Sequence, residues 1–434
     1  MAFGAMIGWS WVLLTGDWLT RAGTLGTLLA FVIGGTAMVF IGLTYAELAA
    51  AMPQAGGEHV YTLRAFGRTP SFICTWALLM GYLTVPTFEA VALPTAVEYL
   101  FPAMKAGYLW SVGNSDVHLS FVLVGVAATA LMTVINVVGI RLAAFVQGLV
   151  TTLFFLIGVF FLAGAFTNGD PVNIEPLMVN GAAGVLGVLI MVPTVLVGFD
   201  VIPQSAEEID LPFQEIGRLL VISVALAVLW YLLVSLGVAL ALPADARATS
   251  TMATADATAT AWGGGWAGKL LVIGGIGGIM TSWNAFIIGG SRVLYALGHS
   301  GMLPGAFAEL HPRFRTPYKA VLFIGALCAI GPLFGRTILV WLIDAGSFSI
   351  VIAYGMVAAA FLTLRHREPD MPRPFRIRWA RPVGWTALLL CCGLFTLYLP
   401  FSPSALIWPY EWAMVLGWAV LGALFFRRRS ETDS

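Results

Sequence analysis

The chain has 434 residues, of which 59% are hydrophobic and 10% are charged, and its formal net charge at pH 7 is zero. Soluble domains carry about 25% charged residues, so the composition excludes an ordinary soluble domain and indicates a polytopic protein that lies in the lipid bilayer. The balanced charge gives no reason to expect a nucleic acid or an acidic partner.

Apolar runs of membrane length follow one another along the whole chain. A helix that spans a bilayer needs about 20 apolar residues, so the chain has room for roughly twelve spans. The predicted spans cover residues 3–21, 24–50, 70–101, 117–139, 142–166, 182–203, 217–241, 266–298, 318–334, 337–363, 383–400 and 407–426. We therefore expect an all-α polytopic membrane protein with about 12 transmembrane helices.

The first span is interrupted near its start, where glycines bracket the segment Gly4-Ala5-Met6-Ile7-Gly8. In a bilayer, backbone groups outside a regular helix are tolerated only where they line a cavity or are buried in protein. Glycine also lets the backbone approach a ligand closely. The interruption predicts a ligand site, and the alternative is that the two glycines serve helix packing.

The third span carries an acidic residue, Glu89, in its middle. A charge at the centre of a bilayer is costly and usually functional. We expect Glu89 to contact an amine, to carry a proton or to hydrogen-bond within the scaffold, and the sequence leaves these three roles open.

The sixth span is interrupted by residues 194–200, which end in Gly198-Phe199-Asp200. Paired interruptions at corresponding places in two halves of a membrane protein point to a binding site between the halves. Asp200 is a second acid within a predicted span. It gates the pocket, binds a cationic group of the ligand or caps the broken helix.

Positive charges are distributed unequally between the two predicted sides of the membrane. If the N-terminus is cytoplasmic, 17 of the 22 Lys and Arg residues fall on the inner side and 5 on the outer side. Cytoplasmic loops carry the excess of Lys and Arg, so we expect both termini in the cytoplasm and the protein in the cytoplasmic membrane. The stretch 243–265, rich in Ala, Thr and Gly, is then an outer loop of low complexity.

Four local sequences at matching topological positions carry a family resemblance. The most specific is Tyr45-Ala46-Glu47-Leu48 followed by Met52-Pro53-Gln54-Ala55-Gly56-Gly57-Glu58-His59-Val60-Tyr61. The others are Ser291-Arg292-Val293-Leu294-Tyr295-Ala296-Leu297 and the two interrupted spans, the second of which is followed by Ala206-Glu207-Glu208. Together they resemble the amino acid-polyamine-organocation (APC) superfamily of permeases over the first ten predicted spans.

This resemblance implies an architecture. It is a five-plus-five inverted repeat of the LeuT type with discontinuous first and sixth helices. Residues 1–166 would form the first repeat, residues 182–363 the second, and residues 383–426 two peripheral spans. The implied mechanism is alternating access to a site near the membrane midplane, and the implied class is a transporter, not an enzyme.

Two broken helices offer complements to both charged groups of an amino acid. Free amides favour a carboxylate and free carbonyls favour an ammonium group. The first break is expected to hold the carboxylate through Ile7, Gly8, Trp9 and Ser10. The sixth break is expected to hold the ammonium group through the carbonyls of Thr194, Val197 and Gly198, beside Phe199 and Asp200. Superfamily members commonly have a small residue and a glycine where this chain has Trp9-Ser10, so Trp9 either narrows the pocket or packs away from it.

The coupling ion is open between sodium and a proton, with exchange as a third option. Sodium-coupled relatives of this fold hold a Ser/Thr pair in the eighth span, where this chain has Thr281-Ser282. The alternative is that the two hydroxyls bond to helix carbonyls, since such residues also occur in sodium-independent members. The carbonyls of Gly4 and Ile7 would complete an oxygen cage, which suits a hard cation. The fifth span contains no Lys, Arg, Asp, Glu or His, which removes the lysine of some proton-coupled relatives. Sodium is therefore the favoured coupling ion, and no other cofactor is expected.

An inner gate and a substrate class complete the expectations. Glu47 and Arg292 both lie near cytoplasmic span ends, where they either form an inner-gate ion pair or are solvated at the interface, which is the more common role of such residues. The expected function is secondary active transport of an amino acid or a small amine. The alternatives are an ethanolamine-type or polyamine-type amine permease, an amino acid exchanger and a transporter-like membrane sensor, and the sequence does not specify the oligomeric state.

Overall fold

A computed structural model describes residues 6–54, 56–113, 115–139, 144–204 and 213–430. The long helices are α3 (Thr15–Ala51), α5 (Arg68–Leu100), α6 (Leu119–Val138), α7 (Ala144–Asn168), α11 (Phe213–Ala241), α14 (Gly265–His299), α16 (Ile338–Arg367), α17 (Ala380–Leu397) and α18 (Tyr410–Ser430). The short helices are α2 (Ser10–Leu13), α4 (Glu58–Phe66), α8 (Gly181–Leu189), α9 (Val192–Val195), α10 (Val201–Gln204), α12 (Ala244–Thr249), α13 (Ala253–Ala261) and α15 (Tyr318–Cys328). Among the described residues, eight helices are long and apolar enough to cross a membrane, which confirms a polytopic α-helical protein.

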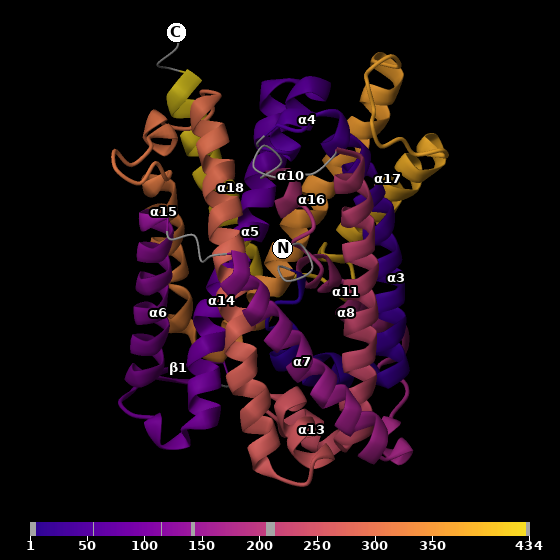
Figure 1. Cartoon of the computed structure of the whole chain (residues 1–434), viewed down its shortest axis with the longest axis vertical. Coiled ribbons are helices and arrows are strands. Elements are labelled where there is room, and N and C mark those ends of the chain that lie inside the picture. Colours follow the sequence, from indigo (N-terminus) through magenta and orange to yellow (C-terminus); the bar gives the residue numbers. More distant parts are fainter. Residues whose placement is uncertain (1–5, 55, 114, 140–143, 205–212, 431–434) are drawn as a thin grey trace.

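The helices pack around α5. This helix lies between α14 and α16, while α3 packs against α8 and α11. Long helices such as α3, α6 and α14 run close to the long axis of the molecule, whereas α7 crosses it obliquely (Figure 1). Helix α4 and the end of α18 lie at one end of the molecule, and α13 and β1 lie toward the other. The predicted topology places two parts of the chain on the inner side of the membrane, namely residues 51–69, which include α4, and the C-terminus. It places residues 243–265 on the outer side, and the arrangement of the helices is compatible with it.

Helix α3 contains a sharp kink at Gly23, whose φ of 76° and ψ of 175° are not helical. A β-carbon at this position would lie 2.7 Å from the backbone of Leu177. Only glycine tolerates both a positive φ and such a close approach of another backbone. The kink at Gly23 lies between the segments predicted as spans 3–21 and 24–50.

The predicted span 318–334 ends earlier in the structure. Helix α15 ends at Cys328 and is followed by the 3₁₀ helix η5 (Gly331–Thr337), inside which Gly335 has a φ of 60°. Pro332 lacks a backbone N–H and cannot continue an α-helix from the preceding turn. The α-helical part is therefore shorter than predicted.

The expectation of a low-complexity loop at 243–265 is wrong, because the structure has helices α12 and α13 there. The Thr254 hydroxyl of α13 donates a hydrogen bond to the Trp11 carbonyl of α2 at 2.7 Å. Small Ala and Thr side chains let two helices approach closely, so this composition serves packing.

The all-α prediction also missed a small hairpin. Strands β1 (Tyr108–Val112) and β2 (Ser115–His118) pair antiparallel between α5 and α6. In the part of the chain that the structure describes, further 3₁₀ turns connect the helices: η1 (Pro102–Met104), η2 (Pro171–Ile174) and η4 (Gly305–Ala308).

Candidate functional site

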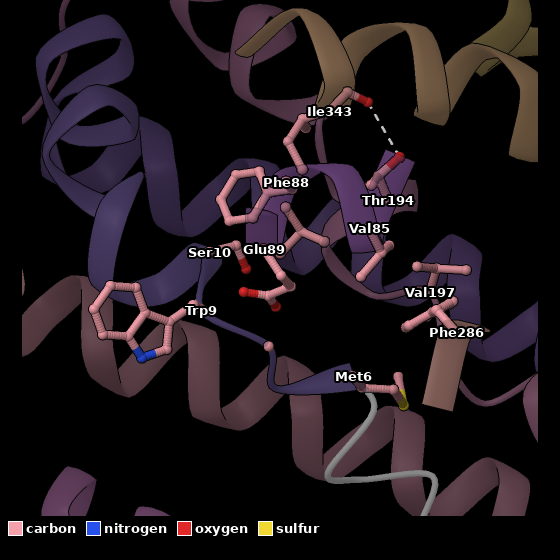
Figure 2. A pocket seen from close by; sticks show the side chains of 12 residues that line it. Met6, Trp9, Ser10, Val85, Phe88, Glu89, Thr194, Val197, Phe286 and Ile343 are labelled. Carbon is pink, nitrogen blue, oxygen red and sulfur yellow. Dashed lines mark hydrogen bonds between the residues drawn. The ribbon is translucent and has the colours of Figure 1, made fainter. Parts of the chain in front are cut away.

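Two interruptions of the backbone line one cavity. The first covers Ile7–Trp9, just before α2, and the second covers Leu196–Asp200, between α9 and α10. The cavity is small, with a volume of about 30 Å³ open to a water-sized sphere, and it is lined by Met6, Gly8, Trp9, Ser10, Val85, Phe88, Glu89, Thr194, Val195, Val197, Phe286 and Ile343. Figure 2 shows these side chains converging from both breaks and from α5, α14 and α16. Most of the wall is apolar, and Glu89 is the ionisable side chain among the lining residues.

Glycine at the first break accommodates the close approach of Glu89 from α5. A β-carbon on Gly8 would lie 3.1 Å from Glu89 Oε1 and 3.5 Å from Ser282 Oγ. Ile7 is buried in the turn without belonging to the cavity wall. Gly4 lies outside the described residues.

Trp9 packs its indole away from the cavity centre, against α14. A β-carbon on Gly275 would lie 2.5 Å from Trp9 Nε1, so the indole fills the space that a side chain at residue 275 would need. Figure 2 shows the ring directed away from Glu89. Of the two expectations for Trp9, the geometry matches packing.

Ser10 belongs to a polar link that closes the first break. Its hydroxyl lies 2.8 Å from the Tyr231 hydroxyl of α11, which donates to the Met6 carbonyl at 3.1 Å. Tyr231 thereby bridges the residues before and after the break. Sequence analysis did not single out Tyr231, because a single Tyr in an apolar span also fits simple packing.

Glu89 is buried, and only one of its two carboxyl oxygens has a hydrogen-bond partner among the described residues. Its Oε1 accepts a hydrogen bond from the Ser282 hydroxyl of α14. Its Oε2 is buried with no partner among the described residues. A buried polar atom without a partner is costly, so Oε2 is an acceptor available to a ligand.

The sixth break is fixed by α16. The Thr194 hydroxyl donates a hydrogen bond to the Ile343 carbonyl at 3.1 Å. The Thr194 amide donates to Ser347 Oγ at 3.0 Å instead of to a carbonyl of its own helix. The Thr194 carbonyl accepts from the Val197 amide at 3.3 Å and also from the Leu196 amide. The Gly198 carbonyl accepts one long turn bond of 3.3 Å, from the Val201 amide. A carbonyl has two lone pairs, so the Gly198 carbonyl retains acceptor capacity. Ser347 was not predicted.

Asp200 and Phe199 lie behind the cavity wall. Asp200 accepts from the Gly198 amide at 3.0 Å and from the Tyr354 hydroxyl at 3.2 Å. Phe199 packs against Tyr45 and Tyr354, with ring centroids 5.4 and 5.5 Å away. Of the roles left open for Asp200, this geometry matches a cap of the broken helix, since its carboxylate is turned to the backbone of the break.

A third acid, Glu58, lies at the start of α4 and was not predicted as functional. It is fully buried, and that burial, with the nearby Asp200 as a smaller cause, raises the pKa of Glu58 well above its usual range. A neutral Glu58 is therefore favoured at the end of the molecule where α4 lies.

The candidate sodium ligands have other partners. Thr281 donates to the Gly278 carbonyl of its own helix at 2.9 Å, and Ser282 donates to Glu89. Within the described residues, no group of three or more His, Cys, Asp or Glu side chains is arranged to hold a metal ion. Sodium binding stays a prediction.

Glu47 makes its ion pairs with residues other than Arg292. Its Oε2 lies 2.6 Å from Arg365 Nη2, and its Oε1 lies 3.1 Å from Arg373 Nε. The Ile377 amide also donates to Oε2 at 2.8 Å. The predicted pairing is corrected, because α16 and the segment after it bring two arginines to the end of α3.

Comparisons with known proteins identify the family of the chain. A family model described as "Amino acid permease" matches residues 1–424. The branched-chain amino acid permease BcaP of Bacillus subtilis is 26% identical over 91% of this chain and 85% of its own length. The methylthioribose transporter of the same organism is 23% identical over 98% and 90%. Cationic amino acid transporter 7 of Arabidopsis thaliana is 26% identical over 98% and 72%.

Proposed function

The chain belongs to the amino acid permease family of the APC superfamily, and from this premise we propose that it moves a small amino acid or amine across the cytoplasmic membrane by secondary active transport. Members of the family are membrane transporters, so the protein is not an enzyme. The observation that carries the proposal is one cavity bounded by two backbone breaks and a single acid.

The cavity offers separate places for the parts of an amino acid. The ammonium group would lie between Glu89 Oε2 and the carbonyls of the sixth break. The carboxylate would lie at the Trp9 amide and the Ser10 hydroxyl, one residue from where the chain bends. Val85, Phe88 and Phe286 give the remaining walls, which favours a small apolar side chain over a charged one.

A panel of radiolabelled substrates tests the function directly. Purified protein in proteoliposomes is expected to take up small apolar amino acids such as leucine in preference to aspartate, because no cation lines the described cavity wall to receive a second carboxylate. Small amines belong in the same panel, since the one ionisable lining residue is an acid. Liposomes without protein are the control, and a protein that binds substrate without moving it would instead be a membrane sensor.

Alternating access would use the two breaks as hinges. The inverted repeat of residues 1–166 and 182–363 stays a prediction, as do the peripheral role of residues 383–426 and the cytoplasmic position of both termini. The sequence also leaves uptake, export and exchange open.

The coupling ion is proposed to be a proton. Ser282 is already bonded to a carboxyl group and Thr281 to its own helix, which supports a protonatable site over an oxygen cage for sodium. Leucine uptake is therefore expected to rise with an acidic outside and to be indifferent to external sodium. If sodium drives uptake and Thr281→Val with Ser282→Ala abolishes that stimulation, the original sodium prediction is correct. Uptake that depends only on internal substrate would indicate exchange.

A further inference from the structure

The segment between α16 and α17 has two faces. From Pro372 to Arg378 the even-numbered residues are exposed and the odd-numbered residues are half-buried. Such an alternation is typical of an extended chain, in which successive side chains point to opposite sides. The two prolines of the segment favour an extended backbone. We call residues 372–378 the strap, with an inner face of odd-numbered residues and an outer face of even-numbered residues.

The inner face fixes the strap to the helix bundle. Arg373 Nε lies 3.1 Å from Glu47 Oε1, and the Ile377 amide donates to Glu47 Oε2 at 2.8 Å. Phe375 lies against α11, where a β-carbon on Gly217 would come within 2.7 Å of its ring. Because three successive inner residues contact α3 or α11, the outer face of the strap stays turned away from the bundle.

The outer face carries positive charge and aromatic surface. Arg376 and Arg378 are exposed, and so is Arg381 at the start of α17. Trp379 lies between them in the chain and is 66% exposed. An indole so far from any core contact fits a membrane interface, where Trp side chains are enriched.

These arginines have no counter-charge in the described chain. Residues 371–381 contain four arginines and no acid. No salt bridge joins Arg376, Arg378 or Arg381 to an acid between the described residues. The acids that lie near the strap are engaged, since Glu47 pairs on the inner face and Glu368 pairs with Arg64. The outer face therefore presents an excess of positive charge.

Helix α17 shows at which depth this charge lies. Arg381, Trp385 and Leu389 follow one another at intervals of four residues, which places them on one face of the helix. Trp385 is 56% exposed and Leu389 is 65% exposed, and α17 is apolar and long enough to cross a membrane. The order from Arg to Trp to Leu matches headgroup, interface and hydrocarbon, so the arginines lie at the level of lipid phosphates.

The strap also lies on the side of the protein predicted to be cytoplasmic. The end of α16 contacts α4 there, because Arg367 donates to the Ala65 carbonyl at 3.1 Å, and α4 lies at the same end of the molecule as the end of α18 (Figure 1). The cytoplasmic leaflet of a membrane carries the anionic lipids that attract basic segments next to a span. Charge and position thus favour the same partner.

We propose that the outer face of the strap, with Arg376, Arg378, Arg381 and Trp379, binds the headgroups of anionic phospholipids. Guanidinium groups donate paired hydrogen bonds to phosphate oxygens, and Trp379 would lie at the base of the headgroups. A zwitterionic headgroup offers the same phosphate but brings its own cation, so it binds more weakly. This inference goes beyond the proposed transport function and does not depend on it.

Native mass spectrometry of the full chain in detergent tests the proposal, with phosphatidylglycerol and phosphatidylcholine of equal acyl chains as probes. An arginine near an anionic lipid contributes about fivefold to affinity. Phosphatidylglycerol is therefore expected to bind at least about 25-fold more tightly than phosphatidylcholine, and less so at high salt. Arg376→Gln with Arg378→Gln is expected to remove most of this difference and to leave phosphatidylcholine binding unchanged.

The matched control is Arg313→Gln with Arg315→Gln before α15, which removes two exposed arginines that have no exposed Trp beside them. It is expected to keep the preference for phosphatidylglycerol. Unchanged unfolding midpoints in phosphatidylcholine micelles would show that both double variants fold, as expected for exposed side chains.

Three results would overturn the inference. Equal affinities of the two lipids for the wild type would mean that the outer face is neutralised by something other than lipid. A full preference in the strap variant would place the lipid elsewhere, and equal losses in both variants would indicate an attraction that is not local to the strap. Uptake is not the readout, so failure of the proposed transport function would leave this test intact.

Discussion

Replacing Glu47 with Gln is expected to lower the free energy of unfolding by about 3–5 kcal/mol, as for the loss of one partner from a buried ion pair. The Glu47 side chain is 1% exposed and meets Arg365 and Arg373, which are 16% and 5% exposed. The neutral amide that replaces the Glu47 carboxylate would leave the buried guanidinium groups of Arg365 and Arg373 without the negative charge that Glu47 supplies. The junction between α3, α16 and the segment that carries Ile377 should loosen first.

Unfolding by a denaturing detergent in mixed micelles measures this loss. The matched control is Glu368→Gln at the end of α16, whose pair with Arg64 has an N–O distance of 2.5 Å but side chains that are 32% and 49% exposed. An exposed pair of this kind contributes about 0–1 kcal/mol. Equal, small losses in both variants would show that the buried cluster of Glu47 is not a stabilising junction.

The two breaks were predictable because their cause is local. A stretch of glycine and polar residues inside an otherwise apolar span can leave the regular helix in a bilayer only where its backbone is buried in protein or lines a cavity. The same reasoning identified Glu89, since an isolated acid in a span demands an explanation wherever the chain folds. Gly8 and Glu89 meet in the structure at the first break, which the sequence placed in one site without specifying the contact.

The partners of Glu47 could not be predicted because they depend on tertiary packing. Arg365 and Arg373 are more than 300 residues away in the sequence, and Arg292 lies near a predicted span end on the same side, so spacing could not distinguish them. Tyr231 and Ser347 were missed for a related reason. Each contacts a break from a distant helix, and neither residue type is unusual in a span.

Composition misled the reading of residues 243–265. Ala, Thr and Gly are frequent in loops of low complexity, but the same residues allow close helix packing, as between α13 and α2. A short apolar helix and a loop of small residues therefore look alike until their neighbours are known.

Replacing Gly8 with Val is expected to reduce leucine uptake at least about 100-fold, equivalent to about 2.7 kcal/mol. The new β-carbon would lie 3.1 Å from Glu89 Oε1 and 3.5 Å from Ser282 Oγ, and two further methyl groups would extend from it. They would push the Glu89 carboxyl group off its hydroxyl donor and occupy the space beside the first break. The smaller variant Gly8→Ala adds only the β-carbon, so its loss of uptake should be intermediate.

The matched control is Gly187→Val on α8, where a β-carbon meets no atom within 4 Å. Initial uptake rates in proteoliposomes report function, and the unfolding midpoint in mixed micelles separates a blocked site from a misfolded protein. Overpacking costs about 1–3 kcal/mol of stability, so a folded Gly8→Val protein with lost uptake is the expected result. Wild-type uptake in folded Gly8→Val would mean that the substrate does not pass between the first break and α5, and the site would have to be sought elsewhere in the bundle.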